Sequence, residues 1–141
     1  MPYLKPLPTP TPENVEFWDG LKRHEFLVPV CDECGDLNWV PYPACRTCQS
    51  EAQTWTKMSG DATVWSYTVV HRGPGAFADE VPYVIVLGKL AEQPRSLIVL
   101  ATMVSDVAPE HITIGMPLRI VYEDIPDEDL TMYKFAPATA S

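Results

Sequence analysis

The second half of the chain alternates apolar and polar residues with the period of two that is typical of β-strands. The segment 62–71, ATVWSYTVVH, shows this alternation most clearly. The pattern predicts two opposite faces, with Val64, Ser66, Thr68 and Val70 on one and Trp65, Tyr67 and Val69 on the other. A loop rich in glycine and proline, RGPGAFADE, ends this strand.

Further apolar segments predict the other strands of the same sheet. They lie at 81–90, 95–104 and 118–125, with a short last strand at 131–138. Gly115 is expected in the turn that precedes the segment 118–125. Because little helix separates these segments, the pattern favours a small antiparallel barrel, and roughly five strands fit an OB-fold that is partly open.

The first 26 residues have a different pattern. Residues 1–12 are rich in proline and threonine, which favours an extended arm, either loose or docked on a partner. A helix is then predicted to start at Thr11 or Glu13, with the apolar residues Val15, Trp18 and Leu21 on one face and Phe17 beside it. This face either packs on the chain's own domain or meets another protein, and the sequence leaves both alternatives open.

Between the predicted helix and the strands lie the only cysteines of the chain, in two Cys-x-x-Cys pairs. They are Cys31 with Cys34 and Cys45 with Cys48. Such pairs bring four thiolates to the corners of a tetrahedral metal site, which predicts a zinc ribbon. Gly35 follows the first pair, where a positive φ is often needed. Rubredoxin-type iron uses the same ligands and is the less favoured alternative, and four thiolates leave no open position for catalysis.

Composition and charge disfavour some classes of function and of location. Ten Lys and Arg stand against nineteen Asp and Glu, a formal net charge of −9. Nucleic-acid binding is therefore not expected, because it requires basic surfaces. The N-terminal segment lacks the pattern of a secretory signal, and the apolar runs are too short to span a bilayer. The sequence predicts a cytoplasmic protein without membrane segments, in a compartment where thiols stay reduced.

The sequence shows no catalytic constellation. It contains no nucleophile elbow, phosphate-binding glycine loop or His-Glu-x-x-His helix. The metal site is expected to use all four cysteines. Of the three histidines, His71 is the most interesting because it adjoins Arg72 and the glycine-proline loop. We favour a structural or interface role for this pair over catalysis and predict no catalytic residue in the chain.

Several motifs in a fixed order resemble the DUF35 family of proteins with a zinc ribbon and an OB-fold. The motifs are FWDGL; CDECG, Pro41 and CRTC; Trp55 with Ser59-Gly60; YTVVHR at 67–72; VPYVIVLGKL at 81–90; and IGMPLRIVYED at 114–124. The chain departs from the family where Val40-Pro41-Tyr42 replaces a frequent Pro-Pro-Arg, and where Arg46 replaces a frequent proline. A role for that family arginine is not carried over.

The resemblance implies a mainly β protein in three parts: an arm and helix at 1–26, a zinc ribbon at 27–54 and an OB-fold barrel at 55–141. It also implies a non-catalytic accessory subunit of a thiolase-superfamily enzyme, such as a lipid-transfer-protein-like aldolase or thiolase. Such an enzyme acts on acyl-CoA thioesters in steroid side-chain or other lipid degradation. Two copies of each chain are expected, and a MaoC-like hydratase is a further possible associate.

In such a complex, acyl-CoA would be bound through the partner enzyme. The residues expected at the interface are Phe17, Trp18, Leu21, Trp39, Tyr42, His71 and Arg72. Two alternatives remain open from the residues alone. One is a module that binds acyl-CoA by itself, and the other, less favoured because of the acidity, is a nucleic-acid-binding protein.

Overall fold

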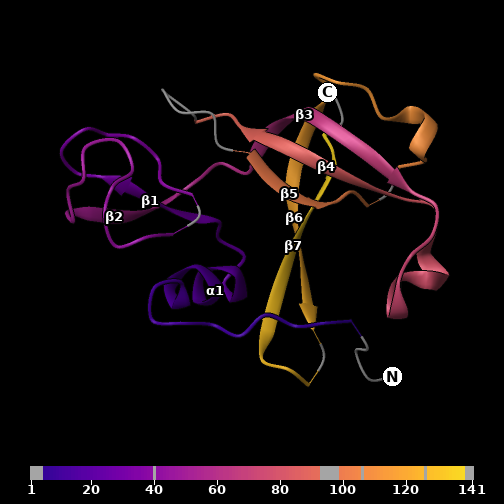
Figure 1. Cartoon of the computed structure of the whole chain (residues 1–141), viewed down its shortest axis with the longest axis horizontal. Coiled ribbons are helices and arrows are strands. Elements are labelled where there is room, and N and C mark those ends of the chain that lie inside the picture. Colours follow the sequence, from indigo (N-terminus) through magenta and orange to yellow (C-terminus); the bar gives the residue numbers. More distant parts are fainter. Residues whose placement is uncertain (1–4, 40, 93–98, 106, 126, 139–141) are drawn as a thin grey trace.

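The computed structural model describes residues 5–39, 41–92, 99–105, 107–125 and 127–138, and these form a mostly β protein with one N-terminal α-helix (Figure 1). The elements in chain order are α1 (Val15–Lys22), β1 (Leu27–Cys31), β2 (Gln53–Lys57), β3 (Asp61–Val70), the 3₁₀-helix η1 (Gly75–Glu80), β4 (Tyr83–Leu90), β5 (Val99–Met103), the 3₁₀-helix η2 (Pro109–His111), β6 (Pro117–Ile125) and β7 (Leu130–Pro137). The predicted fold class is confirmed. The first four residues of the strand predicted at 95–104 lie outside the described residues.

Five strands form the OB-like sheet. Their order is β5-β4-β3-β6-β7, and every neighbouring pair is antiparallel. β6 and β7 cross β3, β4 and β5 steeply (Figure 1), so the sheet is strongly coiled. The coiling brings the two edges together at a parallel bridge between Val104 and Phe135, supported by the Thr102 hydroxyl, which donates to the Tyr133 carbonyl at 3.1 Å. Within the described residues the two edges therefore meet at this bridge and not along a continuous ladder.

A β-bulge in β3 changes the faces that simple alternation predicts. Val64 pairs with Gly88, but Ser66 pairs with Leu87, so Trp65 is an extra residue in the strand. Beyond it Tyr67 lies opposite Val86, whose side chain is fully buried. Because the bulge shifts the register, Val64, Tyr67 and Val69 share the inner side of the sheet. The predicted grouping of Val64 with Ser66, Thr68 and Val70 is therefore wrong.

Helix α1 packs against its own chain. Phe17 and Leu21, one turn apart, are 3% and 0% exposed, whereas Val15 is 38% exposed. The buried stripe thus runs through Phe17 and not through Val15 as predicted. Gly20 lets this helix approach β1 closely, because a Cβ there would lie 2.8 Å from Leu27 Cδ1 and 3.2 Å from the Glu25 carbonyl oxygen. Among the described residues, none of the helices combines the length and apolar character needed to cross a membrane.

The end of α1 is fixed by His24. The Glu25 N–H donates to the Gly20 carbonyl and the His24 N–H to that of Leu21, as in a Schellman motif. His24 takes the left-handed position, with φ of 59°, where glycine is the usual residue. Its ring stacks on Tyr122 at 4.9 Å, and its Nε2 lies 3.1 Å from Asp124 Oδ1. These contacts with β6 compensate the backbone cost and attach the helix to the sheet.

One hydrophobic core extends through the helix, the ribbon and the sheet. It contains Leu21 from α1, Val28 from β1 and Leu37 from the ribbon, together with sheet residues such as Phe135. β2 pairs with β1 and runs across the boundary predicted between residues 54 and 55. β1 and β2 form a two-stranded sheet of their own, so the ribbon and the five-stranded sheet share a core but no strand.

Gly88 makes this core testable, because a Cβ at this position would lie 2.5 Å from Cε2 and Cζ of the fully buried Phe135. We expect Gly88→Ala to lower the free energy of unfolding by about 1–3 kcal/mol through overpacking. The control is Lys89→Ala at the next, exposed position of β4. Urea unfolding of the metal-bound chain measures both variants. Equal midpoints would show that the core accommodates the methyl group.

Candidate metal centre

Two turns with the same backbone hydrogen bonds hold the four cysteines. In the first, the Cys31 N–H donates to the Asp36 carbonyl and the Gly35 N–H to that of Cys31. In the second, the Cys45 N–H donates to the Ser50 carbonyl and the Gln49 N–H to that of Cys45. Gly35 has φ of 77°, which confirms the prediction from sequence. Gln49 takes the equivalent conformation, with φ of 69°, without being glycine.

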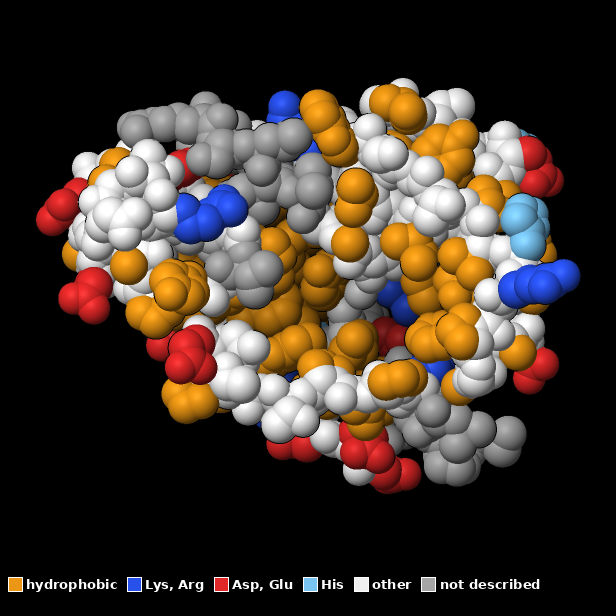
Figure 2. Space-filling view, in the orientation of Figure 1, with side chains coloured by type: hydrophobic (Ala, Val, Ile, Leu, Met, Phe, Trp, Pro, Cys, Tyr) orange, Lys and Arg blue, Asp and Glu red, His pale blue; other side chains and the backbone are white. Residues whose placement is uncertain are grey.

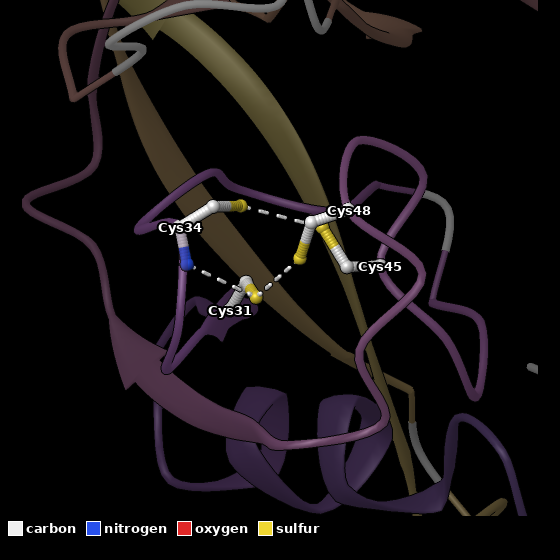
Figure 3. A group of neighbouring side chains, drawn as sticks. All are labelled: Cys31, Cys34, Cys45 and Cys48. Carbon is white, nitrogen blue, oxygen red and sulfur yellow. Dashed lines mark hydrogen bonds between the residues drawn. The ribbon is translucent and has the colours of Figure 1, made fainter.

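These turns direct the four thiols toward one point (Figure 3). The Sγ atoms of Cys31 and Cys48 lie 3.5 Å apart, those of Cys34 and Cys45 lie 3.6 Å apart, and all four lie within 4.8 Å of one another. A tetrahedral zinc ion with ~2.3 Å bonds to sulfur requires edges of about 3.8 Å. The distances are much longer than a disulfide bond, so no disulfide joins these four cysteines. The geometry therefore fits a four-thiolate metal site.

Backbone N–H groups make the site suitable for thiolates. The N–H of Cys34 donates to Cys31 Sγ, and that of Thr47 to Cys45 Sγ, both at 3.4 Å. The pKa of the Cys45 thiol is lowered to about 6, mainly by the backbone N–H of Cys48 and further by the Asn38 side chain. Donors of this kind stabilise the charged form of sulfur, which is the form that binds metal.

The thiols also compete for negative charge. At Cys48 the backbone N–H of Ser50 acts to lower the pKa, but the thiols of Cys31, Cys34 and Cys45, together with partial desolvation, outweigh it and raise the value to about 12. Four sulfur atoms this close cannot all be ionised without a counter-charge. A divalent cation supplies that charge, so the donor set fits a dication such as zinc.

Two buried polar side chains join the two turns. Asp36, 1% exposed, accepts a hydrogen bond from the Thr47 hydroxyl through Oδ2 and another from the Leu37 N–H through Oδ1. Asn38, 0% exposed, accepts from the Arg46 N–H at 3.0 Å. Sequence reasoning missed these residues. Polar residues directly after a metal-binding turn were the available signal, but only the fold shows that they reach the second turn.

The predicted interface residues are scattered over the molecule. Phe17 and Leu21 belong to the chain's own core, and Trp39 packs on Phe17 with ring centroids 4.6 Å apart. Trp18 is half-buried, and its ring makes a T-shaped contact with that of Phe17, with centroids 5.0 Å apart. Tyr42 is 66% exposed on the ribbon.

His71 and Arg72 are exposed directly after the end of β3. That end of β3 lies at the opposite side of the molecule from β1 and β2 (Figure 1). The seven residues therefore do not form one surface.

The fold and the thiol cluster define a class: proteins in which a four-cysteine ribbon is joined to an OB-like sheet. Comparisons with known proteins agree. Residues 18–52 match the family model of the ChsH2 rubredoxin-like zinc ribbon domain, and residues 55–123 match that of the ChsH2 C-terminal OB-fold domain. A DUF35 domain-containing scaffold protein of Methanocaldococcus jannaschii is 32% identical over 130 residues, covering 87% of this chain and 89% of that protein. The chain belongs to the DUF35 family, as its motifs predicted.

Two longer relatives are similar as well. The 3-oxo-4,17-pregnadiene-20-carboxyl-CoA hydratase alpha subunit of Mycobacterium tuberculosis is 36% identical over 123 residues, covering 87% of this chain and 38% of that protein. The probable enoyl-CoA hydratase alpha subunit of Thermomonospora curvata is 33% identical over 135 residues, covering 96% of this chain and 40% of that protein. The chain thus spans 40% or less of the length of these relatives.

Solved structures share the same architecture. An Ltp2-ChsH2(DUF35) aldolase chain superposes with a TM-score of 0.82 and 31% identity, covering 94% of this chain and 100% of that chain. A DUF35 protein from Sulfolobus solfataricus, of unknown function, superposes with a TM-score of 0.62 and 18% identity, covering 90% and 86%. The second likeness shows the fold alone.

The hydrogen bond between Thr47 and Asp36 predicts a role in metal retention. Thr47→Val keeps the size of the side chain but removes the hydroxyl donor to a buried carboxylate. We expect the variant to lose metal about tenfold more readily, as is typical when groups supporting metal ligands are removed. The measurement is competition with a chromogenic chelator.

The matched control is Arg46→Ala. The side chain of Arg46 is exposed, and only its backbone N–H takes part in the contact with Asn38, so this variant should retain metal normally. Equal retention by Thr47→Val and the control would contradict a supporting role for Thr47.

Proposed function

We propose that the chain is a non-catalytic accessory subunit that binds an enzyme acting on acyl-CoA thioesters and stabilises or activates it. One observation carries this proposal: the chain is similar along 94% of its length to the whole of a chain in an Ltp2-ChsH2(DUF35) aldolase. The scaffold-protein relative in M. jannaschii, which the chain matches along most of its length, supports the same role. No residue of the chain is assigned a catalytic step.

The partner we propose is a thiolase-superfamily enzyme, either a lipid-transfer-protein-like aldolase or a thiolase, in a complex with two copies of each chain. The CoA thioester would be bound through that partner. The relative named for a pregnadiene carboxyl-CoA supports a steroid or other lipid substrate. The two hydratase alpha subunits support an additional association with a MaoC-like hydratase. The cytoplasm, which keeps thiols reduced, is the compartment we propose.

The metal in this proposal is a structural zinc ion held by Cys31, Cys34, Cys45 and Cys48. The zinc ribbon model of the family and the convergent thiols support it. Four protein ligands complete the coordination of zinc, so the ion would stabilise the ribbon and leave the chemistry to the partner. The division of the chain at 1–26, 27–54 and 55–141 is part of the same proposal, with β2 extending past the second boundary to Lys57.

A second candidate function is the binding of acyl-CoA by the chain itself. Two adjoining cavities, of 220 and 110 Å³, share Met103 and Lys134 as lining residues. A hollow with charged side chains at its floor and hydrophobic ones around it is visible on the face shown in Figure 2. However, Lys134 lies 3.3 Å from Glu123, and Lys5 lies 2.7 Å from Glu80. Because both cations already face carboxylates, the accessory role has the stronger support.

The experiment that tests the proposed function is purification of the tagged chain from its own host, followed by native mass spectrometry and assay with acyl-CoA substrates. We expect a stoichiometric thiolase-like enzyme that carries the activity. The variant Cys31→Ser/Cys34→Ser should lose its zinc and should co-purify with little of the partner enzyme. The reason is that metal binding contributes the folding energy of such ribbons. A matched variant, Asp32→Asn/Glu33→Gln, changes exposed residues of the same turn and should keep both.

Two outcomes would contradict the proposal. One is a chain that purifies as a monomer and binds CoA by itself, which would favour the second candidate. The other is a double cysteine variant that has lost its metal but still supports full activity of the partner.

A further inference from the structure

A cavity of 340 Å³ lies between the arm that precedes α1 and the ribbon, away from the thiol cluster's own ligands. Four prolines and the rings of Tyr42 and Trp55 form its apolar walls. The Tyr42 side chain is 66% exposed, so its ring is accessible from solvent. The cavity is thus a preformed recess with aromatic walls, which is the common form of a binding site.

The charged groups among the residues lining this recess are all acidic. Glu13 enters from the arm and Glu51 from the ribbon, and no Lys, Arg or His is among the described residues that line it. Neither carboxylate takes part in an ion pair found among the described parts of the chain. The recess therefore carries negative charge without a cationic partner from its own wall.

The recess also contains a hydrogen-bond acceptor, the side-chain oxygen of Gln53, that no donor in the described ranges of the chain reaches. The Gln53 side chain donates through Nε2 to the Tyr42 carbonyl at 3.0 Å, which orients the amide. Its Oε1 is buried and has no hydrogen-bond partner among the described residues. A buried acceptor of this kind is unfavourable unless an N–H reaches it.

Of the protein side chains, arginine matches these features best. Its guanidinium is planar, stacks on aromatic rings and offers five N–H donors to carboxylates and amide oxygens. Lysine lacks the flat face and holds its hydration more strongly. We propose that this recess binds an arginine side chain of the partner protein, stacked on Tyr42 or Trp55 and paired with Glu13 and Glu51. The inference rests on the proposed function, since it names the chemistry by which the partner is held.

The test uses the full-length, metal-bound chain labelled with ¹⁵N. The probe is N-acetyl-arginine-N-methylamide, and N-acetyl-citrulline-N-methylamide is the neutral control of nearly the same shape. The readout is the indole signal of Trp55, identified by its loss in Trp55→Phe. We expect the arginine compound to shift this signal with half-saturation in the millimolar range, as suits a few exposed contacts, and the citrulline compound to leave it unchanged.

Two charge variants distinguish binding in the recess from general electrostatic attraction of the arginine compound to an acidic protein. Glu13→Gln/Glu51→Gln should weaken binding by about fivefold, the size expected for two exposed ion pairs. Glu16→Gln/Glu110→Gln removes the same charge from exposed positions outside the recess and should bind normally. Tyr42→Ala, at a position that is mostly exposed, should weaken binding while leaving thermal stability unchanged.

The inference is overturned if the two compounds act equally, if neither shifts the Trp55 signal, or if the two charge variants behave alike. These outcomes are distinguishable from failure of the proposed function. Binding of the probe by a chain that has no enzyme partner would refute the accessory role and keep the arginine site. The opposite result would be an enzyme complex that forms as well with Glu13→Gln/Glu51→Gln as with the unchanged chain, while the unchanged chain does not bind the probe. That result would refute only the arginine site.

Discussion

The structure depends on a cluster of aromatic rings centred on Phe26, the residue that precedes β1. Its side chain is fully buried, and its ring lies 5.3 Å from that of Phe17 in α1 and 5.1 Å from that of Tyr133 in β7. Trp39 from the ribbon joins the cluster 4.6 Å from Phe17. Aromatic pairs of this kind contribute about 0.5–1.5 kcal/mol each beyond the burial of their area. The cluster thus connects helix, ribbon and sheet, which would otherwise be three small units with little core of their own.

This connection gives the metal site a wider role than holding one loop. Cys31 is the last residue of β1, whose strand also carries the buried Val28 and pairs with β2. Hydrogen bonds of Asp36 and Asn38 connect this region to the second turn. Because metal binding contributes folding energy where the ligands are drawn from separate turns, the zinc we propose would stabilise the shared core as well as the ribbon. The zinc ion would also hold the recess between Tyr42 and Trp55 in place, because the same two strands contribute residues to that recess.

Features that depend on neighbours in sequence could be predicted, and those that depend on distant contacts could not. The spacing of the cysteines and the position of Gly35 indicate the metal-binding turns, since each turn is local. Gln49 in the second turn gave no such signal, because its conformation is imposed by hydrogen bonds and not by residue type. The bulge at Trp65 reverses the expected faces of β3 and becomes visible only in its pairing with β4. His24 likewise looks like a solvated helix end until Tyr122 and Asp124 are placed beside it.

The central claim is that this chain supports an enzyme without being one, and reconstitution tests it most directly. The measurement is the turnover rate and thermal inactivation of the purified partner enzyme on its acyl-CoA substrate, with and without an equimolar amount of this chain. The account predicts no turnover by the chain alone, and a partner that becomes more active or longer-lived when the chain is added. Turnover by the isolated chain, or a partner indifferent to its presence, would contradict the account.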